Sequence, residues 1–170
     1  MKSLRIAVPL FLLLTATFVF SQTAAQKSFD QLKTLTGSWE GKNSKGDPLR
    51  VSFRDTAGGS ALMSEIIGEG HEDMISMIHM DGANRLMLTH YCGAGNQPRM
   101  TASTSADGKI ITFNFLDGTN LSSPDSGRMQ RVVFTIVDPN HHTEDWTFAA
   151  GPGKEMKEFF DLHRNEIAQK

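Results

Sequence analysis

The sequence has a single cysteine, Cys92, among its 170 residues. One thiol cannot form an intrachain disulfide, so the fold must be stabilised by its core. The formal net charge is -2 and no basic run or stripe occurs, which argues against a nucleic-acid-binding surface. The apolar residues show almost no 3.6-residue periodicity, which disfavours a helical fold.

The common enzyme signatures are also missing. The turn Gly93-Ala94-Gly95 lacks the later glycine and the following helix of a dinucleotide-binding loop. No Gly-x-Ser-x-Gly nucleophile elbow is present. These absences favour binding over catalysis, and the sequence predicts no cofactor.

The N-terminus has the pattern of an export signal. Lys2 and Arg5 precede an apolar run from Ile6 to Phe20, and Thr23-Ala24-Ala25 offers small residues for cleavage. The run is shorter than the roughly 20 residues that span a bilayer as a helix. We therefore expect a signal peptide over 1–25, one domain over 26–170, no stable membrane insertion after cleavage, and a periplasmic or extracellular protein. Loss of the two cations moves the formal net charge from -2 to -4.

The rest of the chain alternates short β-prone segments with turn residues such as Asp81-Gly82, Asp107-Gly108 and Gly151-Pro152-Gly153. Ten strands at near-even spacing predict an all-β fold, a single antiparallel up-and-down β-barrel of eight to ten strands. The expected strands are 37–42, 49–55, 61–67, 73–80, 85–92, 99–105, 109–116, 129–137, 142–148 and 156–164.

Two segments interrupt this rhythm. Ser28-Phe29-Asp30-Gln31 can form a capping box, which predicts a short N-terminal helical turn with Phe29, Leu32 and Leu35 on one side. Asp117 to Arg128 is longer than an ordinary hairpin loop. It either covers the mouth of the barrel or is a solvated loop without a ligand role.

The first predicted strand contains Gly37-Ser38-Trp39-Glu40-Gly41. This Gly-x-Trp at the start of an exported all-β domain resembles the calycin superfamily, which includes lipocalins, fatty-acid-binding proteins and nitrobindin-like ten-stranded barrels. The resemblance implies that a helical turn plugs one end, that Gly37 allows a close backbone approach, and that Trp39 closes the floor under a basic residue of the last strand. Arg164 is the candidate for that residue. The chain departs from the pattern at Asn43, where nitrobindin-like barrels have glycine, and it lacks the later lipocalin motifs.

A second resemblance is to secreted bacterial lipocalin-like proteins, and it implies no activity because none is established for that group. The shared residues are His79-Met80-Asp81-Gly82, Leu86-Met87-Leu88-Thr89-His90-Tyr91-Cys92 and Gly95-Asn96-Gln97-Pro98-Arg99-Met100.

Strand alternation places His90 and Cys92 on the face of Leu86 and Leu88. If the leucines face the lumen, an imidazole and a thiol there could bind metal, activate a nucleophile or hydrogen-bond a ligand. The simpler interpretation is a histidine satisfied by polar neighbours beside a buried thiol.

A metal site or enzyme is the alternative function. His142 and Glu144 share a strand face, and a His-x-Glu pair can supply a metal ligand and a general base. Zinc would require these residues to converge with His79, His90 or Cys92 from other strands.

Haem is a further alternative. Nitrobindin-like barrels hold haem through a histidine of a late strand, and His163 is the only histidine of the last one. His163 and Arg164 are adjacent and must point to opposite faces, so His163 is expected outside if Arg164 covers Trp39.

The apolar residues favour a binding function. Methionine adapts to irregular shapes, so the methionines of three successive strands suit either a pocket or an ordinary core. We expect a small, largely apolar ligand that is bound without chemical conversion. The predicted ligand-binding residues are His90, Cys92, Met77, Met87, Asn114, Phe113 and Arg131.

Overall fold

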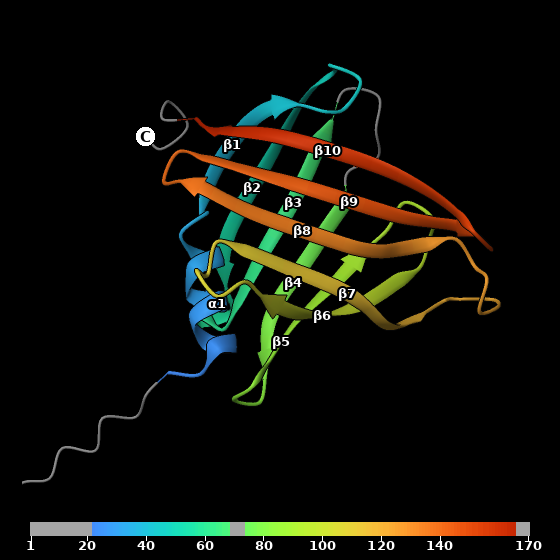
Figure 1. The fold of residues 1–170 in the computed structure, drawn as a ribbon, viewed down its shortest axis with the longest axis horizontal. Coiled ribbons are helices and arrows are strands. Elements are labelled where there is room, and N and C mark those ends of the chain that lie inside the picture. Colours follow the sequence, from blue (N-terminus) through green and yellow to red (C-terminus); the bar gives the residue numbers. More distant parts are fainter. Residues whose placement is uncertain (1–21, 69–73, 166–170) are drawn as a thin grey trace, which may run out of the picture.

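The computed structural model describes residues 22–68 and 74–165. Ten antiparallel strands form one closed barrel in which each strand pairs with its neighbours in sequence and the last pairs with the first (Figure 1). This confirms the predicted fold. The elements are α1 (Ala24–Lys33), β1 (Gly37–Lys42), β2 (Pro48–Thr56), the short 3-10 turn η1 (Ala57–Gly59), β3 (Ala61–Gly68), β4 (Met74–Asp81), β5 (Arg85–Tyr91), β6 (Gln97–Thr104), β7 (Ile110–Thr119), β8 (Arg128–Asp138), β9 (His141–Gly151) and β10 (Lys154–Arg164).

Strand alternation decides which side chains fill the interior of the barrel, because successive side chains point to opposite faces of a sheet. In β2, Leu49, Val51 and Phe53 are buried while Arg50 and Arg54 are exposed. The same alternation in the other strands builds one continuous hydrophobic core inside the barrel. Closing the sheet also pairs both of its edges, which would otherwise present free backbone groups.

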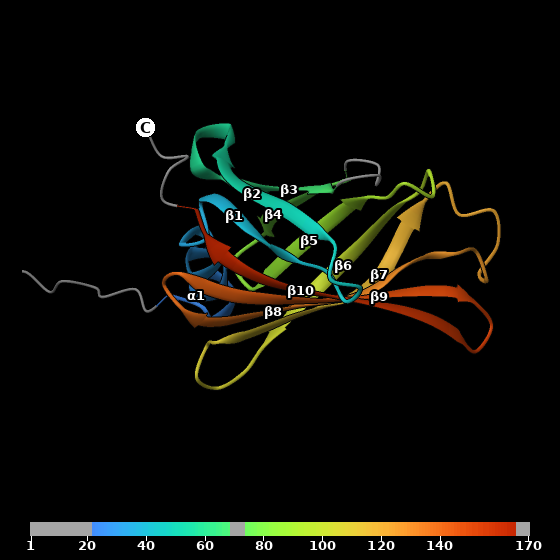
Figure 2. The same cartoon turned by 90° about the horizontal axis from the view of Figure 1, so that it is seen from above.

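Helix α1 closes one end of the barrel, as Figure 2 shows from above. Phe29, Leu32 and Leu35 are 3%, 0% and 1% exposed, so the side predicted from the sequence does face the core. The predicted start at Ser28 is wrong. Thr23 is the N-cap, and its hydroxyl accepts a hydrogen bond from the backbone N–H of Gln26 (3.1 Å).

Ser28 instead lies inside α1, because the earlier cap lets the helix begin at Ala24. Its hydroxyl donates to the Ala24 carbonyl (2.9 Å) and lies 2.7 Å from the Thr104 hydroxyl of β6. Residues 1–21 of the expected export signal lie outside the described residues. In the part of the chain that is described, no helix is long and apolar enough to cross a membrane.

Closure between β1 and β10 depends on a glycine. A Cβ atom on Gly41 would lie 1.8 Å from the carbonyl oxygen of Asp161 in β10, so no side chain fits there. This close approach of β1 and β10 is at Gly41, while the one that the resemblance implies at Gly37 stays a prediction. Gly37 has φ 129°, in the range that favours glycine, and this conformation leads the chain into β1.

Candidate functional site

Three buried polar side chains form a row across neighbouring strands. Ser64 of β3 is opposite Ser76 of β4, and Ser76 is opposite His90 of β5. All three are essentially inaccessible to solvent, with 1%, 1% and 0% of their surfaces exposed. We call Ser64, Ser76 and His90 the polar row. It places hydrogen-bonding groups inside an otherwise apolar wall.

His90 is the chemically distinctive member of the polar row. Its Nδ1 lies 2.9 Å from the Ser76 hydroxyl, and its ring centroid lies 5.1 Å from that of Trp146. Burial lowers the pKa of His90 to about 4, because the charged imidazolium would lose its hydration. The ring is therefore neutral near pH 7.

The polar row is not saturated. Neither His90 Nε2 nor the Ser64 hydroxyl has a hydrogen-bond partner among the described residues. A buried polar atom without a partner costs about 1–3 kcal/mol. A bound molecule or water that supplied the missing partners would recover part of that free energy.

A second buried polar group lies on β9. Trp146 Nε1 donates a hydrogen bond to Glu144 Oε2 (2.8 Å), and His142 Nε2 lies 3.1 Å from Glu144 Oε1. The His142 ring also packs edge-on against Trp39, with centroids 4.3 Å apart. Both carboxylate oxygens are occupied within the protein, so this group fixes the orientation of Trp146 and His142.

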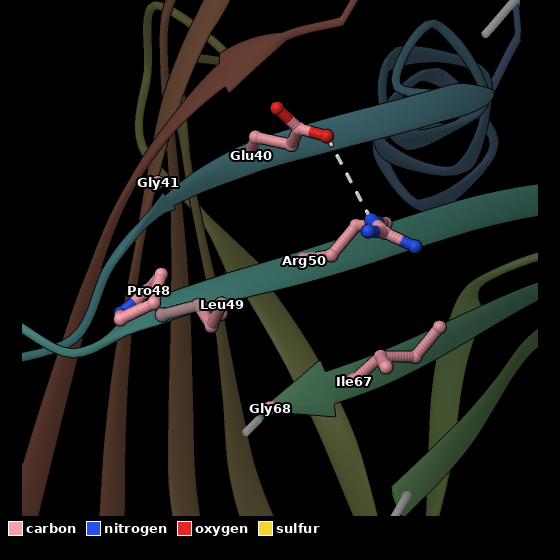
Figure 3. A pocket seen from close by; sticks show the side chains of 7 residues that line it. All are labelled: Glu40, Gly41, Pro48, Leu49, Arg50, Ile67 and Gly68. Atoms are coloured by element: carbon pink, nitrogen blue, oxygen red, sulfur yellow. Dashed lines mark ion pairs between the residues drawn. The ribbon is translucent and has the colours of Figure 1, made fainter.

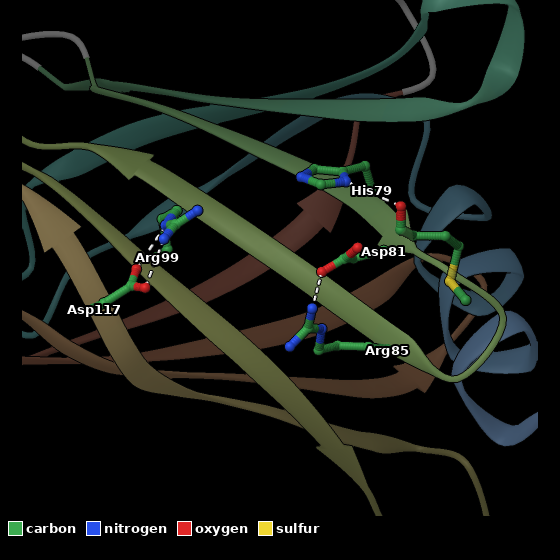
Figure 4. Close-up of polar contacts among 6 residues, drawn as sticks. His79, Asp81, Arg85, Arg99 and Asp117 are labelled. Atoms are coloured by element: carbon green, nitrogen blue, oxygen red, sulfur yellow. Dashed lines mark hydrogen bonds and ion pairs between the residues drawn. The ribbon is translucent and has the colours of Figure 1, made fainter.

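The structure does not assemble the metal site that the sequence suggested. His79 lies on the outer face of β4 with its Nδ1 3.1 Å from the Met80 carbonyl (Figure 4). Among the described residues, no three of His79, His90, Cys92, His142 and Glu144 bring their ligand atoms together.

Cys92 lies just beyond the end of the strand that carries His90. It follows the last residue of β5, Tyr91, and its backbone N–H closes a turn onto the Asn96 carbonyl (3.1 Å). Strand alternation does not extend into that turn, so a shared face for His90 and Cys92 stays a prediction. Cys92 is partly exposed.

The remaining predicted ligand-binding residues divide between the two faces of the wall. Phe113 is 0% exposed and belongs to the core. Asn114 and Arg131 are exposed and lie opposite each other on β7 and β8, so their expected place in the lumen is wrong. Because Phe113 points inward, its neighbour Asn114 must point outward.

The expectation is also wrong for both methionines. Met77 lies between the inward-facing Ser76 and Ile78, and it is therefore on the outer face. Met87 is 5% exposed, yet it lies opposite the outward-facing His79 and outside the interior core. Neither side chain lines the interior.

A cavity of about 210 Å³ lies at the barrel end opposite α1. Its lining is mainly apolar, and it includes none of the ligand-binding residues predicted from the sequence. We call it the mouth cavity; its lining residues are Asn43, Leu49, Ile66, Gly68, Met74, Glu158 and Phe160. Alternation in β2, β3 and β10 could have identified the inward residues, but only closure of the barrel shows which strand ends meet.

The mouth cavity lies next to the polar row. Ile66 in its wall is two residues from Ser64 on the same face of β3. Phe160 in its wall packs against Trp146, with ring centroids 6.3 Å apart, and Trp146 in turn packs against His90. An apolar entrance therefore lies one layer of side chains away from unpaired polar atoms.

Two further surface features lie outside the barrel. A groove of about 410 Å³ crosses β1, β2 and β3, and an ion pair between Arg50 Nε and Glu40 Oε1 (3.7 Å) spans it (Figure 3). On the opposite wall, Arg99 donates two hydrogen bonds to Asp117 (2.6 and 2.5 Å), and this pairing raises the pKa of Arg99 (Figure 4). Such exposed pairs contribute little to stability.

The barrel is similar to a solved structure, Rv2717c from M. tuberculosis. The TM-score is 0.58 with 16% identity, and the similarity covers 82% of this chain and 98% of that one. At this identity the likeness establishes the fold alone. A redesigned β-barrel matches 79% of this chain with 14% identity, and its TM-score of 0.35 is too low to establish a shared fold. The sequence matches no protein-family model, and no curated protein is significantly similar to it.

Proposed function

We propose that this protein is an exported, calycin-like barrel that binds one small, mostly apolar molecule in its mouth cavity without converting it chemically. The observation that carries the proposal is the position of that cavity. Its apolar wall of Leu49, Ile66 and Phe160 lies one layer of side chains from the unpaired polar atoms of Ser64 and His90. Apolar surface with a few convergent polar groups is the usual form of a small-molecule site.

The cavity volume limits the size of the ligand. A protein cavity of about 150 Å³ can hold benzene, whereas drug-sized ligands occupy about 300–1,000 Å³. At about 210 Å³ the mouth cavity fits a molecule with one or two rings, or a short chain. Larger lipids would have to leave most of their length outside the barrel.

The polar groups define what such a ligand should carry. Neutral imidazole both donates and accepts hydrogen bonds, and the Ser64 hydroxyl can do either. Because burial holds the pKa of His90 at about 4, a fully charged carboxylate gains no ion pair from it near pH 7. A neutral molecule with one hydroxyl, carbonyl or ring N–H group is the best match.

Export and the calycin assignment rest on separate observations. Lys2, Arg5 and the apolar run from Ile6 to Phe20 support export. The calycin assignment is supported by Trp39, which is buried at the end closed by α1, and by the Arg164 guanidinium above its ring. The intact mass of protein recovered from outside the cytoplasm tests the export step, because cleavage removes about 2–3 kDa from the chain.

Titration with indole, a probe of suitable size with one N–H donor, tests the ligand site. The methionine methyl groups, labelled with ¹³C, report the position of binding by NMR. Met74 lines the mouth cavity, Met100 is fully buried in the core, and Met156 is 59% exposed. We expect saturable shifts that are largest at Met74 and negligible at Met156.

Two variants complete the test. Ile66→Trp should fill the mouth cavity and abolish the saturable shift, whereas Leu116→Trp, at a position 46% exposed, should leave it intact. Leu49→Trp at the same cavity replaces Ile66→Trp if that variant does not fold. Shifts that never saturate, or that persist in both cavity-filling variants, would refute the proposed site.

A further inference from the structure

Three potential metal ligands meet on the outer surface of the barrel, away from the mouth cavity. They are His141 of β9 and Asp161 and His163 of β10, and their ligand atoms all lie within 4.8 Å of one another. His141 Nε2 is 2.7 Å from Asp161 Oδ1, and His163 Nε2 is 3.7 Å from the same oxygen. We call these residues the β9–β10 cluster.

The strand pairing builds this cluster. His163 lies directly opposite His141, while Asp161 lies two residues from His163 on the same outer face. The register depends on a β-bulge near the hairpin: Lys154 pairs with Gly151, but Glu155 pairs with Ala149, so Ala150 is the extra residue. Without that bulge, His163 would face the inward-pointing His142.

The two imidazoles already adopt a shared orientation. Their centroids are 4.3 Å apart and their planes differ by 17°, so the rings stack face to face with both Nε2 atoms near the Asp161 carboxylate. The side chains are 26%, 53% and 65% exposed for His141, Asp161 and His163, which leaves room for water ligands. The three donor atoms are therefore close together before any ion binds.

We propose that the β9–β10 cluster binds one divalent transition-metal ion, with Zn²⁺ and Cu²⁺ as the best matches. Two imidazole nitrogens and one carboxylate oxygen are a donor set that both ions accept. Metal–ligand bonds of about 2.0–2.2 Å in a tetrahedral site place donor atoms roughly 3.3 Å apart. The observed separations of 2.7 and 3.7 Å lie on either side of that value, so small side-chain rotations suffice.

The metal site would join β9 to β10 near the end of the barrel that α1 closes. Arg164, the next residue after His163, donates to the Pro139 carbonyl from Nε (3.1 Å), and its backbone N–H donates to the Asn140 carbonyl (3.0 Å). A metal bridge from His141 to His163 would add a third connection there. Binding to the folded state alone stabilises it, so the metal should raise Tm.

Calorimetric titration of tag-free, chelator-treated protein tests the site. We expect one Zn²⁺ per chain, tighter binding of Cu²⁺ according to the Irving–Williams order, and no detectable binding of Mg²⁺, which prefers oxygen ligands. The Nε2 resonances of His141 and His163 should shift on Zn²⁺ addition, while that of His79 stays in place. Tm should rise with Zn²⁺ concentration.

Matched variants identify the ligands. His141→Ala, His163→Ala and Asp161→Asn should each weaken Zn²⁺ binding by at least about tenfold, because loss even of an indirect partner of a metal typically costs that much. His79→Ala, on another outer strand, should bind as the parent does. Stoichiometric binding that survives His141→Ala/His163→Ala, or the absence of saturable binding in the folded parent, would overturn the proposal.

Discussion

The guanidinium of Arg164 lies over the indole of Trp39, with Cζ 4.3 Å from the ring centroid. Trp39 is fully buried and its Nε1 donates to the Leu35 carbonyl (2.7 Å), whereas Arg164 donates from Nη1 to Thr36 and from Nη2 to Thr34, both at 2.8 Å. This pair joins the first strand, the last strand and the segment after α1. It therefore holds the closed end of the barrel together.

Replacing Arg164 should destabilise that end. Arg164→Ala removes a cation–π contact and several charged hydrogen bonds at a partly exposed site, so we expect a loss of about 2 kcal/mol in the free energy of unfolding. Arg164→Lys should lose less, because the ammonium group keeps the cation–π contact but cannot reach all the carbonyls. Denaturant unfolding followed by Trp fluorescence measures both. Arg99→Ala, which breaks an exposed ion pair, is the control and should leave the midpoint nearly unchanged.

Gly41 should tolerate no side chain. Gly41→Ala places a Cβ atom against the Asp161 carbonyl, a backbone atom that cannot rotate away, and must push β1 and β10 apart. We expect a loss of about 3 kcal/mol or more, at the upper end of the range for overpacking.

Gly46→Ala is the control for Gly41→Ala. Gly46 has φ 87° and open space around it, so alanine there should cost only the roughly 1–2 kcal/mol of a left-handed residue. Thermal unfolding of the two variants compares the costs. Equal losses would contradict the close approach at Gly41.

His90 should make stability depend on pH. Its pKa in the folded protein is about 4, below the usual 6.5, so the unfolded chain binds more protons between these values. The resulting stabilisation is complete above about pH 6.5 and falls as the pH drops towards 4, by an amount of the order of 3 kcal/mol.

The difference between the parent and His90→Gln isolates that contribution. Glutamine retains a polar side chain but does not titrate in this range. The unfolding free energy of the His90→Gln variant should therefore fall less steeply than that of the parent as the pH drops from 6.5 to 4. Urea unfolding at pH 4.5, 5.5 and 7 provides the comparison. Parallel pH profiles would show that His90 is not buried as described.

Glu144 should matter more as a hydrogen-bond acceptor than as a charge. Glu144→Ala leaves Trp146 Nε1 and His142 Nε2 without partners in the core, and we expect a loss of about 3–5 kcal/mol. Glu144→Gln keeps an acceptor for the indole and should cost clearly less. Urea unfolding at neutral pH ranks the two variants, and equal losses would mean that the carboxylate charge dominates.

The barrel could be predicted from the sequence alone because its strands and turns are specified by residues that are close together in the chain. Alternating apolar residues and glycine-containing turns specified ten strands, and the Gly-x-Trp resemblance correctly predicted Arg164 over Trp39. The same alternation puts Asn114 on the outer face of β7, because its neighbour Phe113 points inward. The prediction of Asn114 as a residue that orients a ligand in the lumen ignored that alternation. Alternation cannot place the Cys92 thiol, because β5 ends at Tyr91, one residue before the predicted end of that strand.

The mouth cavity and the β9–β10 cluster could not be predicted in this way. Both depend on how distant segments meet: Leu49, Ile66 and Phe160 become neighbours only when the barrel closes. His141 and His163 become partners only through the one-residue shift at the Ala150 bulge. Neither closure geometry nor a bulge leaves a clear pattern in a single sequence.

Native mass spectrometry of the protein purified from its own host tests ligand binding in the mouth cavity most directly. We predict a non-covalent adduct of one small molecule per chain, which disappears on denaturation and is absent from the Ile66→Trp variant prepared in the same way. Leu116→Trp should retain the adduct. A ligand-free mass in the parent, together with a crystal structure in which side chains fill the space between Leu49, Ile66 and Phe160, would contradict the account.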